Sequence, residues 1–307
     1  MRSKWCSAST NPPGPVVRSS SPGETDVRIG IIGTENSHVD HIIDYLNVER
    51  RAGETRVVAL CGGASERNEK LRVIGQLERL VDAPTDLLGL VDAVIITDRH
   101  GGLHRDHAVP FLAEGLPVFV DKPLACSEAD ARAIVAAARE HDALLTSSSA
   151  VRWVPDTDAL AEQAVSLGAP QTVITTGPAD PGSEYGGIYF YGIHPVDVAL
   201  RLAPGAVGEV SVEQFADTIV AGADVGGVRV VVQFVRPSSD GRVPFHGLVV
   251  GRHGLAAREL ILGPSYVEPG LRAFLEMVET RRPPIDYDDL VRPMQFLDAV
   301  VEAIRSH

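Results

Sequence analysis

The sequence is poor in several residue types, and each shortage excludes a class of protein. Only three cysteines occur among 307 residues, Cys6, Cys61 and Cys126, and they lack the spacing of metal ligands. A disulfide framework is therefore not expected, and the composition fits a reducing cytoplasm. No run approaches the ~18 apolar residues of a membrane-spanning helix. A net charge of -13 argues against binding to nucleic acid or to an anionic membrane surface.

The sequence has enough apolar residues for two folded domains. Hydrophobic residues make up 44% of the chain, and a domain typically takes about 150 residues. The first 25 residues are instead rich in Ser, Pro and Gly, without the apolar stretch of a secretory signal. We predict a disordered leader over residues 1–25, a first domain over 26–148 and a second domain over 149–307.

Strands and helices alternate in the first predicted domain. Short β-branched runs that are typical of buried strands begin at Val27, and segments with apolar residues at helical spacing separate them. Ser127 is the expected N-cap of the helix before the last of these strands. The alternation predicts a doubly wound parallel sheet covered on both faces, the Rossmann nucleotide-binding arrangement. The expected strands are 27–33, 56–61, 91–97, 116–121 and 143–149.

The pattern changes after about residue 150. Two helices are expected there, one over 152–168 and one that begins near His194, with a strand at 171–177 between them. Strands collected in the middle of a domain predict an α+β fold, here with a mostly antiparallel sheet and helices on one side. The expected later segments are strands within 210–220, 225–236 and 245–254, and helices at 270–282 and 288–307.

The turn after the first strand, GIIGTENSH, is a dinucleotide-type turn with an incomplete glycine pattern. The full fingerprint is G-x-G-x-x-G, because glycines let the backbone approach a pyrophosphate at a helix N-terminus. Glu35 also brings a negative charge near the expected phosphates. The alternative is therefore a turn that no longer holds a dinucleotide well. We predict cofactor binding by Gly30, Gly33, Thr34, Asn36, Ser37 and His38.

The end of the second strand lacks the acidic residue that usually binds the adenosine ribose. The sequence there is Cys61-Gly62-Gly63, followed by Ser65 and Arg67. An arginine in this place is a weak signal for the 2′-phosphate of NADP. The choice between NAD and NADP therefore stays open.

Three histidines follow the strand at 91–97, at positions 100, 104 and 107. Histidines so close together suggest a metal site, but their spacing matches no recognised ligand pattern. Histidines at the start of a helix commonly act as caps or packing groups. We predict no metal.

Lys122 is the most informative single residue. The chain has only three lysines, and Lys4 and Lys70 lie in polar surroundings. Lys122 instead follows the apolar run FVD and precedes a proline, at the carboxyl end of a predicted strand, where parallel sheets bind ligands. Burial can lower the pKa of a lysine toward the range of an acid or base, and arginine cannot take that role. The alternative is a salt-bridged loop lysine.

A second group of polar residues occurs in YFYGIHPVD, from Tyr189 to Asp197. His194 and Asp197 are three residues apart near a helix start, so the carboxylate could orient the imidazole. Tyr189 and Tyr191 add two phenols. The alternative is a capped helix with aromatic packing.

Together these segments resemble the glucose–fructose oxidoreductase/inositol dehydrogenase (Gfo/Idh/MocA) family. The resemblance runs from Val27 to the C-terminus and is carried by VRIGIIGT, VDAVIIT, GLPVFVDKPLACSEADARAIVAAA, RWVP, GIHPVD and the last thirty or so residues. Asp121-Lys122-Pro123 stands where the family usually has Glu-Lys-Pro. The family implies hydride transfer between NAD(P) and a sugar, cyclitol or related substrate, and a homodimer or homotetramer assembled through an open second-domain sheet.

The resemblance also implies roles for single residues. Lys122 looks like the family's central lysine, His194 like its catalytic-site histidine, Arg152 like its R-x-x-P arginine and His104 like its loop histidine. Cofactor contacts are further implied for Thr97, Asp98, His104, Asp121 and Lys122. Substrate contacts are implied for Arg152, Trp153, Tyr189, Tyr191, His194 and Asp197.

One departure from the family falls beside the histidine. Members often have Asp four residues before it, and here that residue is Phe190. Tyr191 or Tyr189 could replace the missing acid as proton donor. We predict Tyr191 as a catalytic residue together with Lys122 and His194.

These observations leave three hypotheses for function. The first is an NAD(P)-dependent oxidoreductase that acts on a hydroxyl, keto or imine carbon of a small polar or secondary metabolite. The second is a lyase, isomerase or cyclase that lost dinucleotide binding and uses Lys122 and His194 for acid–base chemistry. The third is a non-catalytic partner subunit. Cofactor binding separates the first hypothesis from the others.

Overall fold

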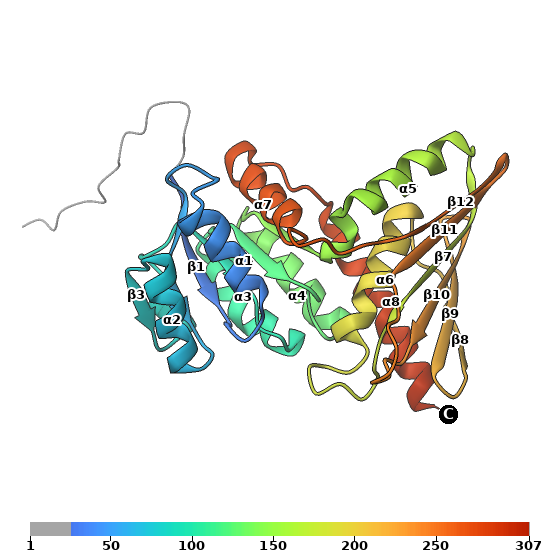
Figure 1. Cartoon of the computed structure of the whole chain (residues 1–307), viewed down its shortest axis with the longest axis horizontal. Helices are drawn as coiled ribbons and strands as arrows, with labels where there is room; N and C mark the ends of the chain where they lie inside the picture. The colour runs from blue at the N-terminus through green and yellow to red at the C-terminus, as the bar shows by residue number, and fades with distance from the viewer. Residues whose placement is uncertain (1–25, 307) are drawn as a thin grey trace, which may run out of the picture.

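The computed structural model describes residues 26–306, so the predicted leader over 1–25 lies outside the described residues. Two six-stranded sheets lie side by side along the long axis, with most of the helices around the first (Figure 1). No helix within 26–306 has the length and apolar character needed to cross a bilayer.

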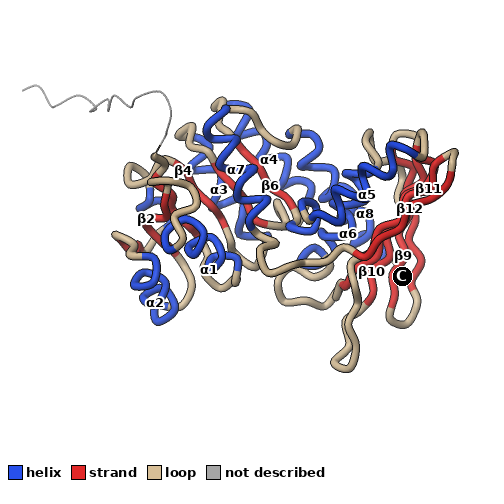
Figure 2. The backbone as a smooth tube through the Cα atoms, turned by 45° about the horizontal axis from the view of Figure 1, so that its top comes forward, coloured by secondary structure: helices blue, strands red, loops and turns tan. Residues whose placement is uncertain are grey.

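The first sheet is entirely parallel and has the strand order β3-β2-β1-β4-β5-β6. This order is that of the Rossmann fold, so the predicted fold class is confirmed. The four inner strands read as continuous apolar runs because helices cover both faces (Figure 2). The strands are β1 (Arg28–Ile32), β2 (Arg56–Cys61), β3 (Arg79–Val81), β4 (Ala93–Ile96), β5 (Val118–Asp121) and β6 (Leu145–Ser148).

The helices of this half connect successive strands. Ser127 is confirmed as the N-cap of α4, because its hydroxyl accepts a hydrogen bond from the Asp130 backbone N–H at 3.1 Å. The helix that begins at His38 changes after one and a half turns into a π-helical segment. The helical segments are α1 (His38–Ile43), η1 (Asp44–Val48), α2 (Ser65–Gly75), η2 (Pro84–Leu87), η3 (Gly101–Leu103), α3 (His104–Ala113) and α4 (Glu128–Glu140).

The second sheet has the order β12-β11-β7-β10-β9-β8 and is antiparallel except for the β7–β10 pair. In β7, β10 and β11 buried residues alternate with half-buried ones, so one face packs on helices and the other is open. The strands are β7 (Pro170–Pro178), β8 (Ser211–Gln214), β9 (Thr218–Val225), β10 (Val228–Val235), β11 (His246–Gly251) and β12 (Gly254–Glu259).

The helices of the second half lie between the two sheets or against the first (Figure 1). The expectation that one helix begins near His194 is wrong, because α6 begins at Tyr189. The helix α7 follows β12 of the second sheet in the chain, but its apolar face packs on the first sheet. There Phe274 stacks on Phe119 of β5. The helical segments are η4 (Ala150–Trp153), α5 (Pro155–Ser166), α6 (Tyr189–Leu202), α7 (Glu268–Thr280) and α8 (Tyr287–Arg305).

Candidate active site

Lys122 enters a cleft directly after β5 ends. The side chain is buried, with 6% of the residue exposed, and its Nζ lies 4.1 Å from the centroid of the Phe190 ring and 5.5 Å from that of Tyr191. No hydrogen bond or ion pair holds this ammonium group among residues 26–306. Burial lowers the pKa of Lys122, the charge of Arg99 lowers it further, and Asp121 opposes the shift. The face of the Phe190 ring therefore stabilises the cation at close range, and the charge of Asp121 adds to this stabilisation without a direct ion pair.

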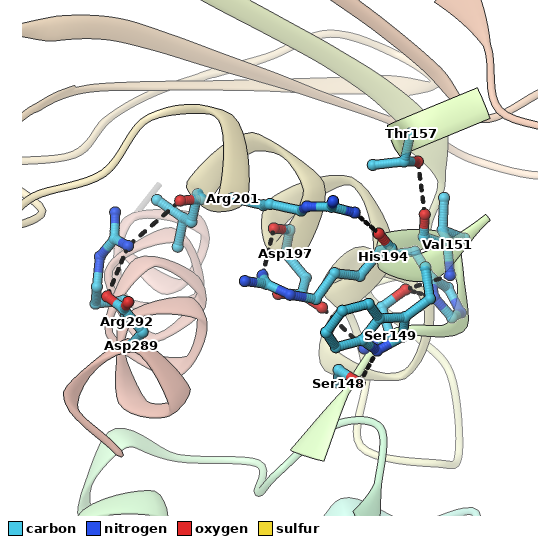
Figure 3. Close-up of polar contacts among 12 residues, drawn as sticks. Ser148, Ser149, Val151, Thr157, His194, Asp197, Arg201, Asp289 and Arg292 are labelled. Atoms are coloured by element: carbon cyan, nitrogen blue, oxygen red, sulfur yellow. Dashed lines mark hydrogen bonds and ion pairs between the residues drawn. The ribbon is translucent and has the colours of Figure 1, made fainter. Parts of the chain in front are cut away.

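His194 lies on α6 with its ring orientation fixed by Ser149. Its Nδ1 lies 2.6 Å from the Ser149 hydroxyl, which also accepts the backbone N–H of Val151 at 3.1 Å (Figure 3). Within residues 26–306 the only acceptor in reach of the hydroxyl hydrogen is Nδ1. We therefore assign Ser149 as the donor, which leaves the proton of the neutral imidazole on Nε2.

The environment of His194 favours this neutral form. Burial lowers the pKa of His194 well below its ordinary value, and the charges of Lys122 and His38 act in the same direction. Near pH 7 the side chain is therefore an N–H donor rather than a cation. Its Nε2 is the nitrogen left for a ligand, since Nδ1 is taken by Ser149.

Asp197 does not orient His194, so that expectation is wrong. One carboxylate oxygen of Asp197 pairs with Arg152 at 2.8 Å, and the other accepts the Ser149 backbone N–H at 2.8 Å. Asp197 thus positions Ser149, and Ser149 in turn positions His194. Asp197 acts on His194 through Ser149 and not by the direct contact that the sequence spacing suggested.

The cleft has a volume of about 300 Å³ and draws its walls from both halves of the chain. Lys122 and His194 both line it, and Tyr191, which is 44% exposed, lies beside His194 with ring centroids 5.6 Å apart. Three predicted catalytic residues therefore face one space. The lining residues are Glu35, Asn36, Ser37, His38, Arg99, Lys122, Ala150, Phe190, Tyr191, His194, Leu262 and Tyr266.

The turn between β1 and α1 forms one end of the cleft. The backbone N–H groups of residues 34–37 donate to no acceptor within the described chain, and Glu35 and Ser37 are exposed. Free N–H groups at such a turn suit a phosphate. Gly33 is needed because its φ is +80° and a Cβ would lie 2.7 Å from the Cα of Asp98.

Asn36 and His38 turn inward and bind Asp121. Its Oδ2 accepts from Asn36 Nδ2 at 2.9 Å and lies 2.7 Å from His38 Nδ1. Burial alone would raise the pKa of Asp121, but the charge and hydrogen bond of His38, together with the charge of Lys122, lower it to about 2. The carboxylate is therefore ionised and ties β5 to the turn.

Arg67 lies on α2, and its side chain reaches the same β1–α1 turn. Its guanidinium donates to the carbonyls of Thr34 and Asn36 and pairs with Asp40 at 2.6 Å. The cation is thus already neutralised by a carboxylate of the protein. The segment Cys61-Gly62-Gly63 itself carries no acidic residue.

Several predicted cofactor residues are buried supports rather than parts of the cleft wall. Gly30 faces Leu87 and Val91, and the Thr97 hydroxyl donates to the carbonyl of Gly33. Three other predicted residues are likewise engaged within the protein. Thr34 bonds Asn68 at 2.6 Å, Asp98 lies 2.7 Å from His107, and His104 spans the carbonyls of Pro123 and Asp98 at 2.7 and 3.0 Å.

Four predicted substrate residues also lie outside the cleft lining. Arg152 and Asp197 pair with each other, and Trp153 donates to the Ser148 hydroxyl at 2.6 Å. The Tyr189 hydroxyl donates to Asp298 on α8, and burial is the main cause that raises the pKa of this phenol. The substrate contacts predicted for Arg152, Trp153, Tyr189 and Asp197 stay predictions, since none of the four lines this cleft.

Sequence reasoning missed three residues of the site. Arg99 lies over the Tyr185 ring at 4.2 Å and lines the cleft, and Tyr266 closes another wall against His38. Ser149 was seen only as the end of a strand. No local pattern marks these residues, because each is brought to the site by the packing of distant segments.

No group of three or more His, Cys, Asp or Glu side chains within 26–306 is arranged to hold a metal ion. Of the three clustered histidines, His104 and His107 bind neighbouring carbonyl and carboxylate groups. His100 accepts the backbone N–H of Gly102 at 3.0 Å.

A Rossmann sheet with a cleft at its carboxyl edge is the arrangement of a dinucleotide-binding class of protein. Residues 27–149 match the GFO_IDH_MocA model, described as an oxidoreductase family with an NAD-binding Rossmann fold. The resemblance predicted from the sequence is therefore confirmed for this part of the chain. No curated protein matches the chain in sequence.

Solved structures of similar fold cover nearly the whole chain. GenD2 from gentamicin A biosynthesis, solved with NAD, is 18% identical, with a TM-score of 0.77 over 93% of this chain and 96% of that one. A putative myo-inositol dehydrogenase from Sinorhizobium meliloti is 16% identical, with a TM-score of 0.75 over 91% and 98%. Apo scyllo-inositol dehydrogenase from Lactobacillus casei is 13% identical, with a TM-score of 0.78 over 91% and 96%. These likenesses concern the fold.

Proposed function

We propose that the protein is an NAD(P)-dependent oxidoreductase that acts on a hydroxyl or keto carbon of a small polar substrate. The observation that carries the proposal is the position of Lys122. Its ammonium group has no hydrogen-bond or ion-pair partner among residues 26–306, lies at the carboxyl edge of a Rossmann sheet and shares a cleft with His194. The family match of residues 27–149 supplies the redox class. Sugar- or cyclitol-like substrates are the class that the similar structures suggest.

The turn at residues 34–37 fits a cofactor pyrophosphate through its free N–H groups. Bound there, a nicotinamide dinucleotide would supply hydride acceptance or donation. We propose NAD rather than NADP, because Arg67 is already paired with Asp40 and is not free for a 2′-phosphate.

The protein's own residues would position and protonate the substrate oxygen. The Lys122 ammonium donates a hydrogen bond to that oxygen and stabilises negative charge that develops on it. The Nε2–H of His194 donates a second hydrogen bond from the other wall. Because burial lowers the pKa of Lys122, this ammonium releases a proton more readily than the ammonium of a surface lysine does.

Cofactor titration and one lysine variant test this function. We expect micromolar binding of NADH by fluorescence titration, with weaker binding of NADPH. Lys122→Met should keep NADH binding and lose at least about 1,000-fold in turnover, on the scale that proton transfer and charge stabilisation contribute. Lys70→Met is the matched control, because Lys70 is an exposed lysine paired with Glu66.

The alternative is a non-redox lyase, isomerase or cyclase in the same cleft. Glu35 in the cleft wall and the lack of a ribose acid favour it. Absence of NADH and NADPH binding up to millimolar concentration would refute the redox function. A lysine-dependent activity without either nucleotide would establish the alternative.

A further inference from the structure

We infer that the substrate carries a carboxylate, which binds Arg99 while its reacting oxygen lies at Lys122 and His194. The inference rests on the proposed function and specifies its substrate class as hydroxy or keto acids, including acidic sugars. Three features carry it: the cations of the cleft, the absence of a carboxylate partner for them, and their spacing.

Two cationic side chains line the cleft without a carboxylate in direct ion-pair contact among residues 26–306, although the charge of the neighbouring Asp121 acts on Lys122. Arg99 makes one hydrogen bond, from Nη1 to the Tyr185 hydroxyl at 3.2 Å, and no ion pair among residues 26–306. Lys122 has no hydrogen-bond partner in the same part of the chain. Arg99 also lowers the pKa of Lys122, so the two charges act on each other. An anion between them would relieve this repulsion.

The carboxylates near Lys122 and Arg99 bind other groups of the protein. Asp121 accepts from Asn36 and His38, and Asp98 lies against His107. Glu35 is the only acidic residue of the lining, and it is exposed at the end formed by the turn. The wall between the two cations is instead the ring of Phe190.

The spacing suits one small molecule. Nζ of Lys122 lies 4.1 Å and Cζ of Arg99 lies 5.4 Å from the centroid of the same Phe190 ring, so the two groups are less than about 10 Å apart. The guanidinium of Arg99 stacks on Tyr185 at 4.2 Å, which limits its motion and leaves other N–H groups free. A planar fork of donors matches a carboxylate in two-point geometry, and a lysine suits a single oxygen.

Matched ligand pairs test the inference by calorimetry, with and without saturating NADH. D-Glucuronate and D-glucose share a ring, and D-gluconate and D-glucitol share a chain; each pair differs in one carboxylate. We expect the acid of at least one pair to bind at least 10-fold more tightly than its neutral partner. Arg99→Gln should abolish that preference, and Arg99→Lys should retain part of it. Arg252→Gln, which removes an exposed charge outside the cleft lining, should leave it unchanged.

The outcomes separate this inference from the proposed function. Binding of NADH together with equal affinity for acid and neutral partner in both pairs overturns the carboxylate inference alone. Loss of NADH affinity in Arg99→Gln, with the acid preference intact, also overturns it, because Arg99 then serves the cofactor. Failure of both NADH and NADPH to bind refutes the redox function, whereas an Arg99-dependent preference for the acid without either nucleotide still supports the anion site.

Discussion

At the scale of single residues, the orientation of His194 depends on a chain of hydrogen bonds between neighbouring side chains and backbone groups. His194 is fixed by Ser149, which is fixed by Asp197, which is paired with Arg152. The links from His194 to Ser149 and from Ser149 to Asp197 are buried and that to Arg152 is partly buried, so each hydrogen bond constrains the next. The proton on Nε2 of His194 therefore depends on a hydroxyl that itself touches no ligand.

Replacing Ser149 with Ala should disturb the tautomer of His194 more than the fold. We expect turnover to fall about 10-fold or more, while stability falls by about 1–2 kcal/mol, as for a lost buried hydrogen bond. The ¹⁵N shifts of the imidazole should show Nδ1 and Nε2 protonation in mixture. Thr157→Val is the control, because the Thr157 hydroxyl makes a similar buried bond to the Val151 carbonyl (Figure 3). Equal kinetic effects in both variants would contradict a positioning role for Ser149.

Asp121 should make the protein sensitive to acid. Its pKa is lowered to about 2 in the folded state, against about 3.9 for an unperturbed Asp. The stabilisation is therefore complete above pH 4 and is lost as the pH falls from about 4 to 2, by about 2 kcal/mol. Urea unfolding of the wild type and of Asp121→Asn across this range measures it. The variant should be less stable at pH 7 and should lose less stability in acid; identical slopes would refute the assignment.

At the scale of elements, the strand–helix alternation was sufficient to predict the parallel sheet. The sequence did not reveal β3 or β12, because each is an edge strand with mostly exposed residues. The start of α6 was misplaced by five residues, since an aromatic run next to glycines does not show helical periodicity. Lys122 was predictable from its place at the carboxyl end of a strand, and His194 from the polar residues grouped around it in the sequence. Arg99 and Ser149 were not, because their partners Tyr185 and His194 are far away in sequence.

The β1–α1 turn should be more sensitive to substitution than other turns. At Gly33 a side chain meets both a φ of +80° and the backbone of Asp98, whereas Gly53 has a φ of +63° and open space around its Cβ position. We expect Gly33→Ala to destabilise the protein by about 3 kcal/mol or more, and Gly53→Ala by about 1 kcal/mol. Denaturant unfolding of both variants gives the comparison. Similar losses would mean that the turn can relax away from β4.

At the scale of the whole molecule, the open face of the second sheet bears on assembly. Val231, Ile174 and Leu248 are half-buried neighbours across β10, β7 and β11, on the face opposite the helices. A row of aliphatic residues on a six-stranded sheet is a surface that a second copy can cover. The homodimer or homotetramer predicted from the sequence stays a prediction.

Sedimentation equilibrium tests this assembly. We expect the wild type to be at least dimeric at micromolar concentration and Val231→Arg to be monomeric. Val73→Arg, on the exposed side of α2, should sediment like the wild type. A monomeric wild type would contradict the predicted oligomer, and an oligomeric Val231→Arg would place the interface elsewhere.

The return of α7 to the first sheet has a consequence for synthesis on the ribosome. Val267, Leu271, Phe274 and Met277 complete the apolar cluster of Val39, Ile42 and Phe119, although more than 140 residues separate them from these partners. The first sheet can form its strands early and α1 can cover part of this face, but the part around Phe119 stays uncovered until nearly the whole chain has emerged. Nascent chains stalled before residue 267 should therefore be targets for chaperones that bind exposed apolar surface.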